Sequence, residues 1–221
     1  DRYNINNDKG WLENSKFKNE IKFILGDIRD FDSVLNSIKG HEIVIHLAAL
    51  IGIPYSYISP LAYIKTNIEG TYNVLEACRI NNIRKVINTS TSEVYGSAIY
   101  TPIDEIHPIQ PQSPYSASKI SADNLSKSYY CSFNSSIKTI RPFNTYGPRQ
   151  SKRAIIPTII SQLLNKNNFI NIGSLETIRD FTFVHDTCKA YLKMINSKSG
   201  ECEAFNVGNN KSISVNELIN L

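Results

Sequence analysis

The sequence lacks the features of a membrane, disulfide-bonded or disordered protein. Its longest apolar stretches, such as Ile43 to Ile53, are far shorter than the ~20 residues of a bilayer-spanning helix, and no charged-then-apolar leader opens it. Lys and Arg are scattered among Asp and Glu, and the net charge of +4 suits a phosphorylated small molecule better than a nucleic acid. The four cysteines show no CxxC spacing and no His cluster, so we expect neither a metal site nor disulfides. With 41% hydrophobic and 20% charged residues, we expect a soluble globular protein of the cytoplasm.

Short β-branched runs alternate with longer segments of helical period, which predicts an α/β fold with a doubly wound, Rossmann-like parallel sheet. The expected strands are Ile21–Leu25, Ile43–Leu47, Lys85–Thr89 and Lys138–Ile140, and the expected helices between them are Leu61–Asn81 and Tyr115–Asn134. Later segments are a helix Ile155–Asn165, a strand near Phe169, an extended segment Phe181–Val184, a helix Thr187–Asn196 and a strand Ala204–Val207. We expect a dinucleotide-binding domain over residues 1–150 and part of a smaller substrate-binding lobe over residues 151–221.

The glycine-rich sequence G-x-G-x-x-G is absent. A doubly wound dinucleotide-binding fold carries this loop in its first strand-to-helix turn, and an acidic residue ~20 residues later holds the adenosine ribose. The chain begins at Asp1 with what reads as the exit from a strand, and it stops at Leu221 inside a helical pattern opened by Ser214. We therefore expect the glycine-loop unit to precede Asp1 and Asp1 to be the ribose-binding acid, with an ordinary loop aspartate as the alternative. Without that loop, the chain itself is not expected to hold the dinucleotide or to turn over.

A tyrosine and a lysine lie one turn apart in the helix that is predicted to open at Tyr115. Tyr115 and Lys119 share one helix face because residues four apart are neighbours. An ammonium beside a phenol stabilises the phenolate and lowers its pKa from ~10 towards the range of a general base. We therefore expect Lys119 to lower the pKa of Tyr115, so that Tyr115 takes a proton from a sugar hydroxyl. The spacing alone also occurs by chance on amphipathic surface helices.

A predicted strand ends in Thr91, Ser92 and Glu93, upstream of this helix. Ligands of open parallel sheets bind beyond the carboxyl ends of the strands, and strand spacing would point Thr91 and Glu93 to the same side. A hydroxyl and a carboxylate together can polarise a sugar oxygen and remove a proton from a neighbouring carbon. We therefore predict Thr91, Ser92, Glu93, Tyr115 and Lys119 as catalytic residues, with a solvated helix cap as the alternative role for Glu93.

Further segments extend this pattern over nearly the whole chain. They are Gly26–Asp30, His46–Ala49, Thr66–Thr71, Thr91–Glu93, Pro114–Lys119, Arg141–Pro148 and Arg179–Phe181. Together they resemble the extended short-chain dehydrogenase/reductases that act on nucleotide sugars, the NAD-dependent epimerase/dehydratase family. Within that family, Gly52–Tyr57 and Pro148–Ser151 look most like the 4,6-dehydratases of legionaminic acid pathways.

The resemblance implies an NAD cofactor, a nucleotide-sugar substrate and a homodimer built on the two long helices. The implied cofactor-binding residues are Asp1, Asp27, Ile28, Leu47, Ala48, Ala49, Tyr115 and Lys119, with Asp27 and Ile28 at the adenine. The implied substrate-binding residues are Tyr55, Ser56, Asn144, Arg153 and Arg179, with the Arg179 fork on the diphosphate. As alternatives, Asp27 and Asn144 could organise turns, and Arg179 could pair with Asp180 or Asp186.

The implied reaction is that of a 4,6-dehydratase: oxidation at C4, elimination of water across C5 and C6, and return of the hydride to C6 to give a 4-keto-6-deoxy sugar. Glu93 would remove the C5 proton. Ser92 stands where dTDP-glucose dehydratases carry Asp, whereas GDP-mannose-type enzymes resemble this sequence. The alternatives are a UDP-glucuronate decarboxylase, a nucleotide-sugar 4-epimerase, which needs no C5 base, and a non-catalytic nucleotide-binding protein, which would not be expected to keep both Tyr115 and Lys119.

Overall fold

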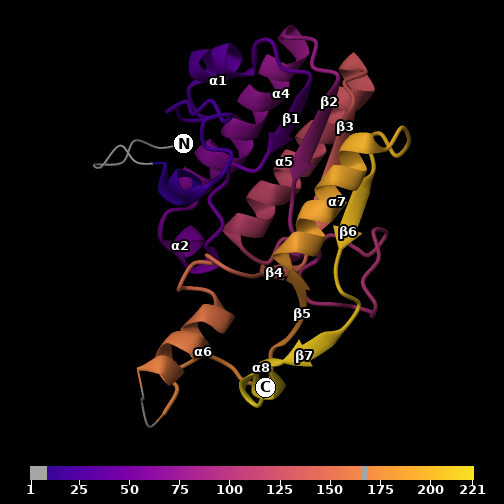
Figure 1. Ribbon diagram of the computed structural model, residues 1–221. Helices are drawn as coiled ribbons and strands as arrows, with labels where there is room; N and C mark the ends of the chain where they lie inside the picture. Colours follow the sequence, from indigo (N-terminus) through magenta and orange to yellow (C-terminus); the bar gives the residue numbers. More distant parts are fainter. Residues whose placement is uncertain (1–8, 166–168) are drawn as a thin grey trace.

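The computed structural model describes residues 9–165 and 169–221. Its main sheet has four parallel strands in the order β1-β2-β3-β6. These strands are β1 (Ile43–His46), β2 (Lys85–Thr89), β3 (Ile137–Pro142) and β6 (Ala204–Val207). Helices α1 (Phe31–Ile38), α4 (Gly70–Ile80) and α5 (Pro114–Phe133) lie on one side of this sheet, and α7 (Val184–Asn196) lies on the other (Figure 1). The predicted α/β fold with a parallel, Rossmann-like sheet is confirmed.

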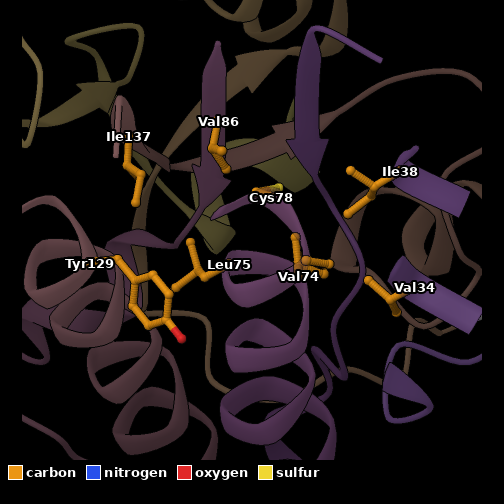
Figure 2. Close-up of a cluster of buried hydrophobic side chains, with 9 residues drawn as sticks. Val34, Ile38, Val74, Leu75, Cys78, Val86, Tyr129 and Ile137 are labelled. Atoms are coloured by element: carbon orange, nitrogen blue, oxygen red, sulfur yellow. The ribbon is translucent and has the colours of Figure 1, made fainter. Parts of the chain in front are cut away.

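Neighbouring residues of β2 pack in two different cores because side chains alternate across a strand. Val86 points to the side of α4 and α5, where it joins Leu75 and Tyr129 in the larger buried cluster (Figure 2). Ile87 points to the opposite side, where it packs with Ile140 and with Met194 of α7. Both faces of β2 are therefore covered, as is usual for a strand inside a parallel sheet.

Helix α5 has clear sequence signals at both ends. The Ser113 side chain accepts a hydrogen bond from the backbone N–H of Ser116, and Pro114 occupies the first turn, where its missing N–H costs nothing. At the other end, Asn134 adopts the left-handed conformation, with a φ of 54°, that commonly terminates a helix. The predicted helix Tyr115–Asn134 is confirmed to within one residue. It places Tyr115 in its first turn, at the end of the sheet where β2 finishes.

The predicted helix Leu61–Asn81 is interrupted. It consists of α3 (Pro60–Tyr63), a π-helical segment η2 (Ile64–Glu69) and α4, and it follows the short helix α2 (Ile53–Ile58). In η2 the buried Asn67 amide donates to the carbonyl of Leu50 and to Ser118 Oγ, both at 2.9 Å, and its oxygen accepts from the N–H of Leu50 at 2.8 Å. π-helical turns often occur at functional sites, and here the turn fixes the segment after β1 against α5.

A smaller lobe lies below the main sheet in Figure 1. It contains β4 (Asn144–Tyr146), α6 (Ile155–Leu164), β5 (Ile178–Phe183), β7 (Ser212–Ser214) and α8 (Val215–Ile219). Its sheet has the order β4-β5-β7, with β4 and β5 parallel and β7 antiparallel. Between β5 and β7 the chain returns to the main sheet through α7 and β6. The predicted boundary at residue 150 does not separate the two sheets, because β4 before it belongs to the smaller sheet and β6 after it belongs to the main sheet. The division into two domains stays a prediction.

Two predicted strands are wrong. Ile21–Leu25 belongs to no strand, because no neighbouring strand in the described residues pairs with its backbone. The structure also has no strand at Phe169. The prediction also missed several short elements. They are the 3-10 helices η1 (Gly10–Asn14) and η3 (Ser92–Tyr95), helices α1 and α2, and strands β4 and β7.

Replacing Leu75 by Ala should lower the free energy of unfolding by ~2–5 kcal/mol, because it leaves a cavity in the larger core. Leu75 is 2% exposed, whereas Leu192 on the outer face of α7 is 59% exposed and provides a matched control. Urea denaturation followed by circular dichroism would measure both variants. Equal effects of Leu75→Ala and Leu192→Ala would contradict this description of the core.

Candidate active site

Tyr115 is buried at the start of α5, with only 6% of its surface exposed. Its ring packs edge-on against Tyr63, with ring centroids 6.2 Å apart, and its hydroxyl is hydrogen-bonded to the side chain of Thr91. Burial raises the pKa of Tyr115 to about 12; the Thr91 hydrogen bond opposes this rise, and the nearby Glu93 carboxylate adds to it. The phenol is therefore neutral and held in one orientation by the end of β2.

Lys119 lies one turn further along α5 and is also buried. Its Nζ donates a hydrogen bond of 2.6 Å to the backbone carbonyl of Thr89, the last residue of β2. Burial lowers the pKa of Lys119 to about 8, against the opposing effect of Asp123. The expected fall in the pKa of Tyr115 is not found: the net shift is upward because burial of the phenol dominates. The Lys119 ammonium is hydrogen-bonded to the strand.

Thr91, Ser92 and Glu93 lie in a turn and not in the predicted strand end. Thr91 caps η3, and its hydroxyl accepts from the backbone N–H of Glu93 at 3.2 Å. The side-chain alternation assumed for these residues does not apply in a 3-10 turn. Thr91 and Glu93 nevertheless both affect the pKa of Tyr115. The Thr91 hydrogen bond lowers it, and the charge of Glu93 raises it.

A cavity of about 830 Å³ adjoins this turn and extends into the smaller lobe. Four residues predicted from the sequence line it: Ser92, Glu93, Asn144 and Arg179. Arg179 lies on β5 with an exposed side chain, whose Nη1 donates to the carbonyl of Ile178 at 2.9 Å. The Asp180 carboxylate instead accepts from the backbone N–H groups of Asn209 and Asn210. Arg179 therefore adds positive charge to the cavity that contains Glu93.

Three other predicted substrate residues do not line this cavity. Tyr55 is half exposed on α2 and packs near Tyr63, which contacts Tyr115. Ser56 is fully buried, and its hydroxyl donates to the carbonyl of Ile53 at 2.7 Å. Arg153 is exposed in the turn that precedes α6. The roles of these three residues in substrate binding stay predictions.

The predicted cofactor residues follow the end of β1. Leu47 and Ala48 are exposed and Ala49 is half buried, so a flat group can lie close to the backbone there. The charge of Lys119 contributes to the lowered pKa of His46, the residue that precedes Leu47. These residues fit one side of a dinucleotide site.

Two further predicted residues, Asp27 and Ile28, lie beside α4. The Asp27 carboxylate accepts from Arg29 Nε at 2.9 Å and from its Nη2 at 2.6 Å. The Ile28 carbonyl accepts from Asn73 Nδ2 at 2.9 Å, and its side chain packs against the core and against Gly70. Asp1 lies outside the described residues.

His46 is a buried neutral histidine. The Thr71 hydroxyl donates to the carbonyl of Asn67 at 2.6 Å, so the 3.0 Å contact between His46 Nε2 and Thr71 Oγ1 requires a proton on Nε2. Burial, assisted by the charge of Lys119, lowers the pKa of His46 to about 3. The imidazole therefore supports the loop between β1 and η2 and needs no role in proton transfer.

The sequence-based prediction missed four residues that contact the candidate site or its supporting elements: Tyr63, Asn67, Asp123 and Arg141. Asp123 had a signal, because it follows Lys119 by the same four residues that separate Lys119 from Tyr115. Arg141 and Asn67 lie inside segments that carry the family resemblance, but sequence alone assigned them no partner. Tyr63 had no signal beyond its place on an apolar helix face.

The fold and this arrangement of side chains define a short-chain dehydrogenase/reductase of the NAD-dependent epimerase/dehydratase class. A family model described as GDP-mannose 4,6 dehydratase matches residues 1–221, and the chain belongs to this family.

Several individual proteins are similar to the chain. It is 32% identical to the dTDP-D-glucose 4,6-dehydratase of Homo sapiens, over 94% of this chain and 59% of that protein. The UDP-N-acetylglucosamine 4-epimerase from Methanobrevibacter ruminantium, solved in complex with UDP-N-acetylmuramic acid, is 35% identical with a TM-score of 0.88, over 97% of this chain and 70% of that one. The UDP-glucose 4-epimerase from Thermus thermophilus, solved in complex with NAD, is 26% identical with a TM-score of 0.85, over 97% and 71%.

The chain spans 50 to 66% of the length of the curated relatives that it matches. In the described part of the chain, no helix has the length and apolar character needed to cross a membrane. Within the same residues, no group of His, Cys, Asp and Glu side chains is arranged to hold a metal ion.

Replacing His46 by Gln should flatten the pH dependence of stability in acid. His46 has an unfolded-state pKa of 6.5 and a folded-state pKa of about 3, so the unfolded chain binds the extra proton. Stability from this group is complete above pH 6.5 and is lost as the pH falls towards 3. Between these values, the slope of unfolding free energy against pH should be smaller in His46→Gln by up to about 1.4 kcal/mol per pH unit.

Urea midpoints measured across this pH range would test the His46 prediction. His185→Gln is the matched control, because His185 is exposed in the first turn of α7. A His46→Gln variant with the same acid slope as the unmodified chain would show that His46 titrates normally in the fold.

Proposed function

We propose that the protein is an NAD-dependent nucleotide-sugar 4,6-dehydratase that forms a 4-keto-6-deoxy sugar nucleotide. The observation that carries the proposal is that Glu93 and Arg179 line one cavity, while Glu93 also acts electrostatically on the Tyr115 phenol. A carboxylate, a guanidinium and a phenol are the groups needed to deprotonate a sugar and to hold its diphosphate. The dehydratase family model and the human dehydratase support this proposal.

Tyr115 is the proposed base for the C4 hydroxyl, and Thr91 orients the phenol through their hydrogen bond. NAD, held by residues 47–49 and by Lys119, would accept and return the hydride, so that the sugar passes through a 4-keto form. Since the pKa of Tyr115 is about 12 in this structure, the phenol needs additional positive charge to ionise near neutral pH. Lys119, with its pKa of about 8, supplies part of that charge while it remains protonated.

Glu93 is the proposed base for the C5 proton, which the neighbouring ketone makes acidic. Ser92 lines the same cavity, but a serine hydroxyl is a poor acid. The proton taken by the Glu93 carboxylate can then pass to the hydroxide that leaves from C6, so that water departs and the carboxylate is regenerated. Asn144 and Arg179, further along the cavity, are proposed to bind the nucleotide diphosphate.

A nucleotide-sugar 4-epimerase is the second candidate. It is favoured by the 35% identity to the UDP-N-acetylglucosamine 4-epimerase, which slightly exceeds the 32% identity to the human dehydratase. Epimerisation uses Tyr115 and Thr91 but needs no base at C5. The position of Glu93 on the cavity therefore favours the dehydratase.

The full-length protein should convert a nucleotide sugar into a product that has lost one water and carries a C4 ketone. Incubation with GDP-, dTDP- and UDP-linked hexoses, followed by mass spectrometry and NMR, would identify the product. A C4 epimer of unchanged mass would establish the epimerase, and carbon dioxide from UDP-glucuronate would establish a decarboxylase. A legionaminic-type substrate preference stays a prediction within this test.

Glu93→Gln should still exchange the C4 hydrogen with the cofactor but should form 6-deoxy product at least ~100-fold more slowly, because it lacks the C5 base. Substrate labelled with deuterium at C4 would separate the two steps. Glu105→Gln is a control that removes a carboxylate from the neighbouring loop. Normal 6-deoxy product from Glu93→Gln would show that another group removes the C5 proton.

Arg179→Ala should raise KM for the nucleotide sugar by roughly 10-fold or more, since a charge-assisted hydrogen bond contributes about 1.5–3 kcal/mol. Arg84→Ala is a matched control, because Arg84 precedes β2 at the amino-terminal end of the strands, away from the cavity. There it pairs with Glu42 at 3.4 Å. Steady-state kinetics with the identified substrate would compare the two. If both variants kept the original KM, Arg179 would not bind the diphosphate.

We also propose a homodimer built on α4 and α5, which pack side by side. Its support is the resemblance to the family, and sedimentation velocity would test it. The cytoplasmic location likewise stays a prediction.

A further inference from the structure

Three ionisable side chains form a stripe along the inner face of α5. Tyr115, Lys119 and Asp123 follow one another at intervals of four residues, and they are 6%, 3% and 9% exposed. An interval of four residues places them on one helix face, here directed at β2 and β3. Tyr115 and Lys119 have roles in the proposed reaction, whereas Asp123 has none so far.

The Asp123 carboxylate is held by both neighbouring strands. From β3, Arg141 donates to its Oδ2 through Nε at 3.2 Å and through Nη2 at 3.1 Å. From the end of β2, Ser90 Oγ donates to the same oxygen at 2.8 Å, and Asn88 Nδ2 donates weakly to Oδ1 at 3.4 Å. Burial raises the pKa of Asp123, whereas Arg141, Ser90 and the ammonium of Lys119 oppose that rise because they favour the charged carboxylate.

Most of the groups that surround Lys119 are uncharged. From α5 it faces the neutral phenol of Tyr115 and the carboxylate of Asp123, from β1 the neutral imidazole of His46, and from β2 the carbonyl of Thr89. The hydroxyl of Tyr191 on α7 contacts Thr89 only from the opposite face of the sheet, at 2.8 Å from Thr89 Oγ1. Burial disfavours the ammonium, and the charge of Asp123 favours it.

We propose that Asp123 is a positioning residue whose carboxylate, clamped between β2 and β3, retains the positive charge of Lys119 beside Tyr115. Its catalytic consequence rests on the proposed function, but the charge coupling is a property of the fold alone. Without Asp123, the buried cations Lys119 and Arg141 would be left without a shared counter-ion, which is costly. Lys119 would then lose its proton more readily and could not stabilise a phenolate.

Arg141 limits this effect because it neutralises part of the Asp123 charge. Its Nη1 also donates to the Tyr95 hydroxyl at 2.9 Å, and that hydroxyl donates to Asn206 Oδ1 on β6 at 2.8 Å. Arg141 is thus tied to β6 as well as to Asp123. Removing the guanidinium should have the opposite effect on Lys119 from removing the carboxylate.

The pKa of Lys119 can be measured directly, without turnover. The protein would be labelled with 13C at the lysine ε carbon, and the Lys119 signal assigned from its loss in Lys119→Met. In the unmodified protein the midpoint should lie near pH 8. In Asp123→Asn it should fall by roughly one pH unit or more. In Arg141→Gln it should rise.

Ser90→Ala is the matched control, because it removes one hydrogen bond to Asp123 and leaves the charge. Its Lys119 midpoint should stay near that of the unmodified protein, as should that of Asp123→Glu. An unchanged midpoint in Asp123→Asn, or one that does not rise in Arg141→Gln, would overturn the proposal. Should Asp123→Asn fail to fold, the direction of the shift in Arg141→Gln decides.

A second measurement connects the charge to the reaction. Once a substrate is identified, the alkaline limb of the kcat profile should move to lower pH in Asp123→Asn, whereas a loss of structure alone would reduce kcat without moving it. If no nucleotide sugar is turned over, the proposed function fails while the NMR midpoints still decide the role of Asp123.

Discussion

A lysine ammonium buried at the end of a β-strand imposes most of the constraints on this site. Lys119 loses nearly all of its hydration, so its charge must be met by polar groups of the fold. The Thr89 carbonyl satisfies one of its protons, and the Asp123 carboxylate compensates the charge from one turn away. Because Asp123 is buried too, it needs donors of its own from β2 and β3, above all Ser90 and Arg141. One buried cation thus requires a network that joins α5 to two strands.

The same helix is fixed on the cofactor side by uncharged groups. Asn67 in the π-helical segment donates to Ser118 of α5 and to the carbonyl of Leu50. It also hydrogen-bonds the N–H of Leu50, so the loop after β1 is held through both of its backbone groups. His46 and Thr71 extend this set without carrying charge. The loop after β1 is therefore held by uncharged hydrogen bonds, whereas the charged network involves Lys119 and Asp123 on α5.

The sequence carried much of this architecture in local patterns. The ends of α5 follow from Ser113, Pro114 and Asn134, and the parallel strands follow from short runs rich in β-branched residues. The gathering of Glu93 with Arg179 was implied by the family resemblance, since the two residues are far apart in the chain. Local patterns succeed where the interaction is with near neighbours or with the solvent.

The remaining features depend on tertiary surroundings that no local pattern encodes. The pKa of Tyr115 is raised chiefly because the phenol is buried, and burial is set by the whole fold. Ser56 has the right chemistry for a substrate contact, but its helix turns the hydroxyl inward. Ile21–Leu25 has strand composition, yet a strand exists only where another strand pairs with it.

The link from Arg141 through Tyr95 to Asn206 also bears on the order in which the site matures during synthesis. β1, β2, α5 and β3 all precede residue 143, whereas Asn206 lies on β6, which pairs with β3 after the smaller lobe has begun. On the ribosome, the sheet can thus form three strands and position Tyr115 and Lys119 before the Tyr95 hydroxyl has its acceptor. In a nascent chain that ends before β6, α5 would already be packed on the sheet, but the Tyr95 hydroxyl would lack its acceptor on Asn206. The hydrogen-bond network behind the proposed active site is thus completed by β6, a strand that contributes no proposed catalytic residue.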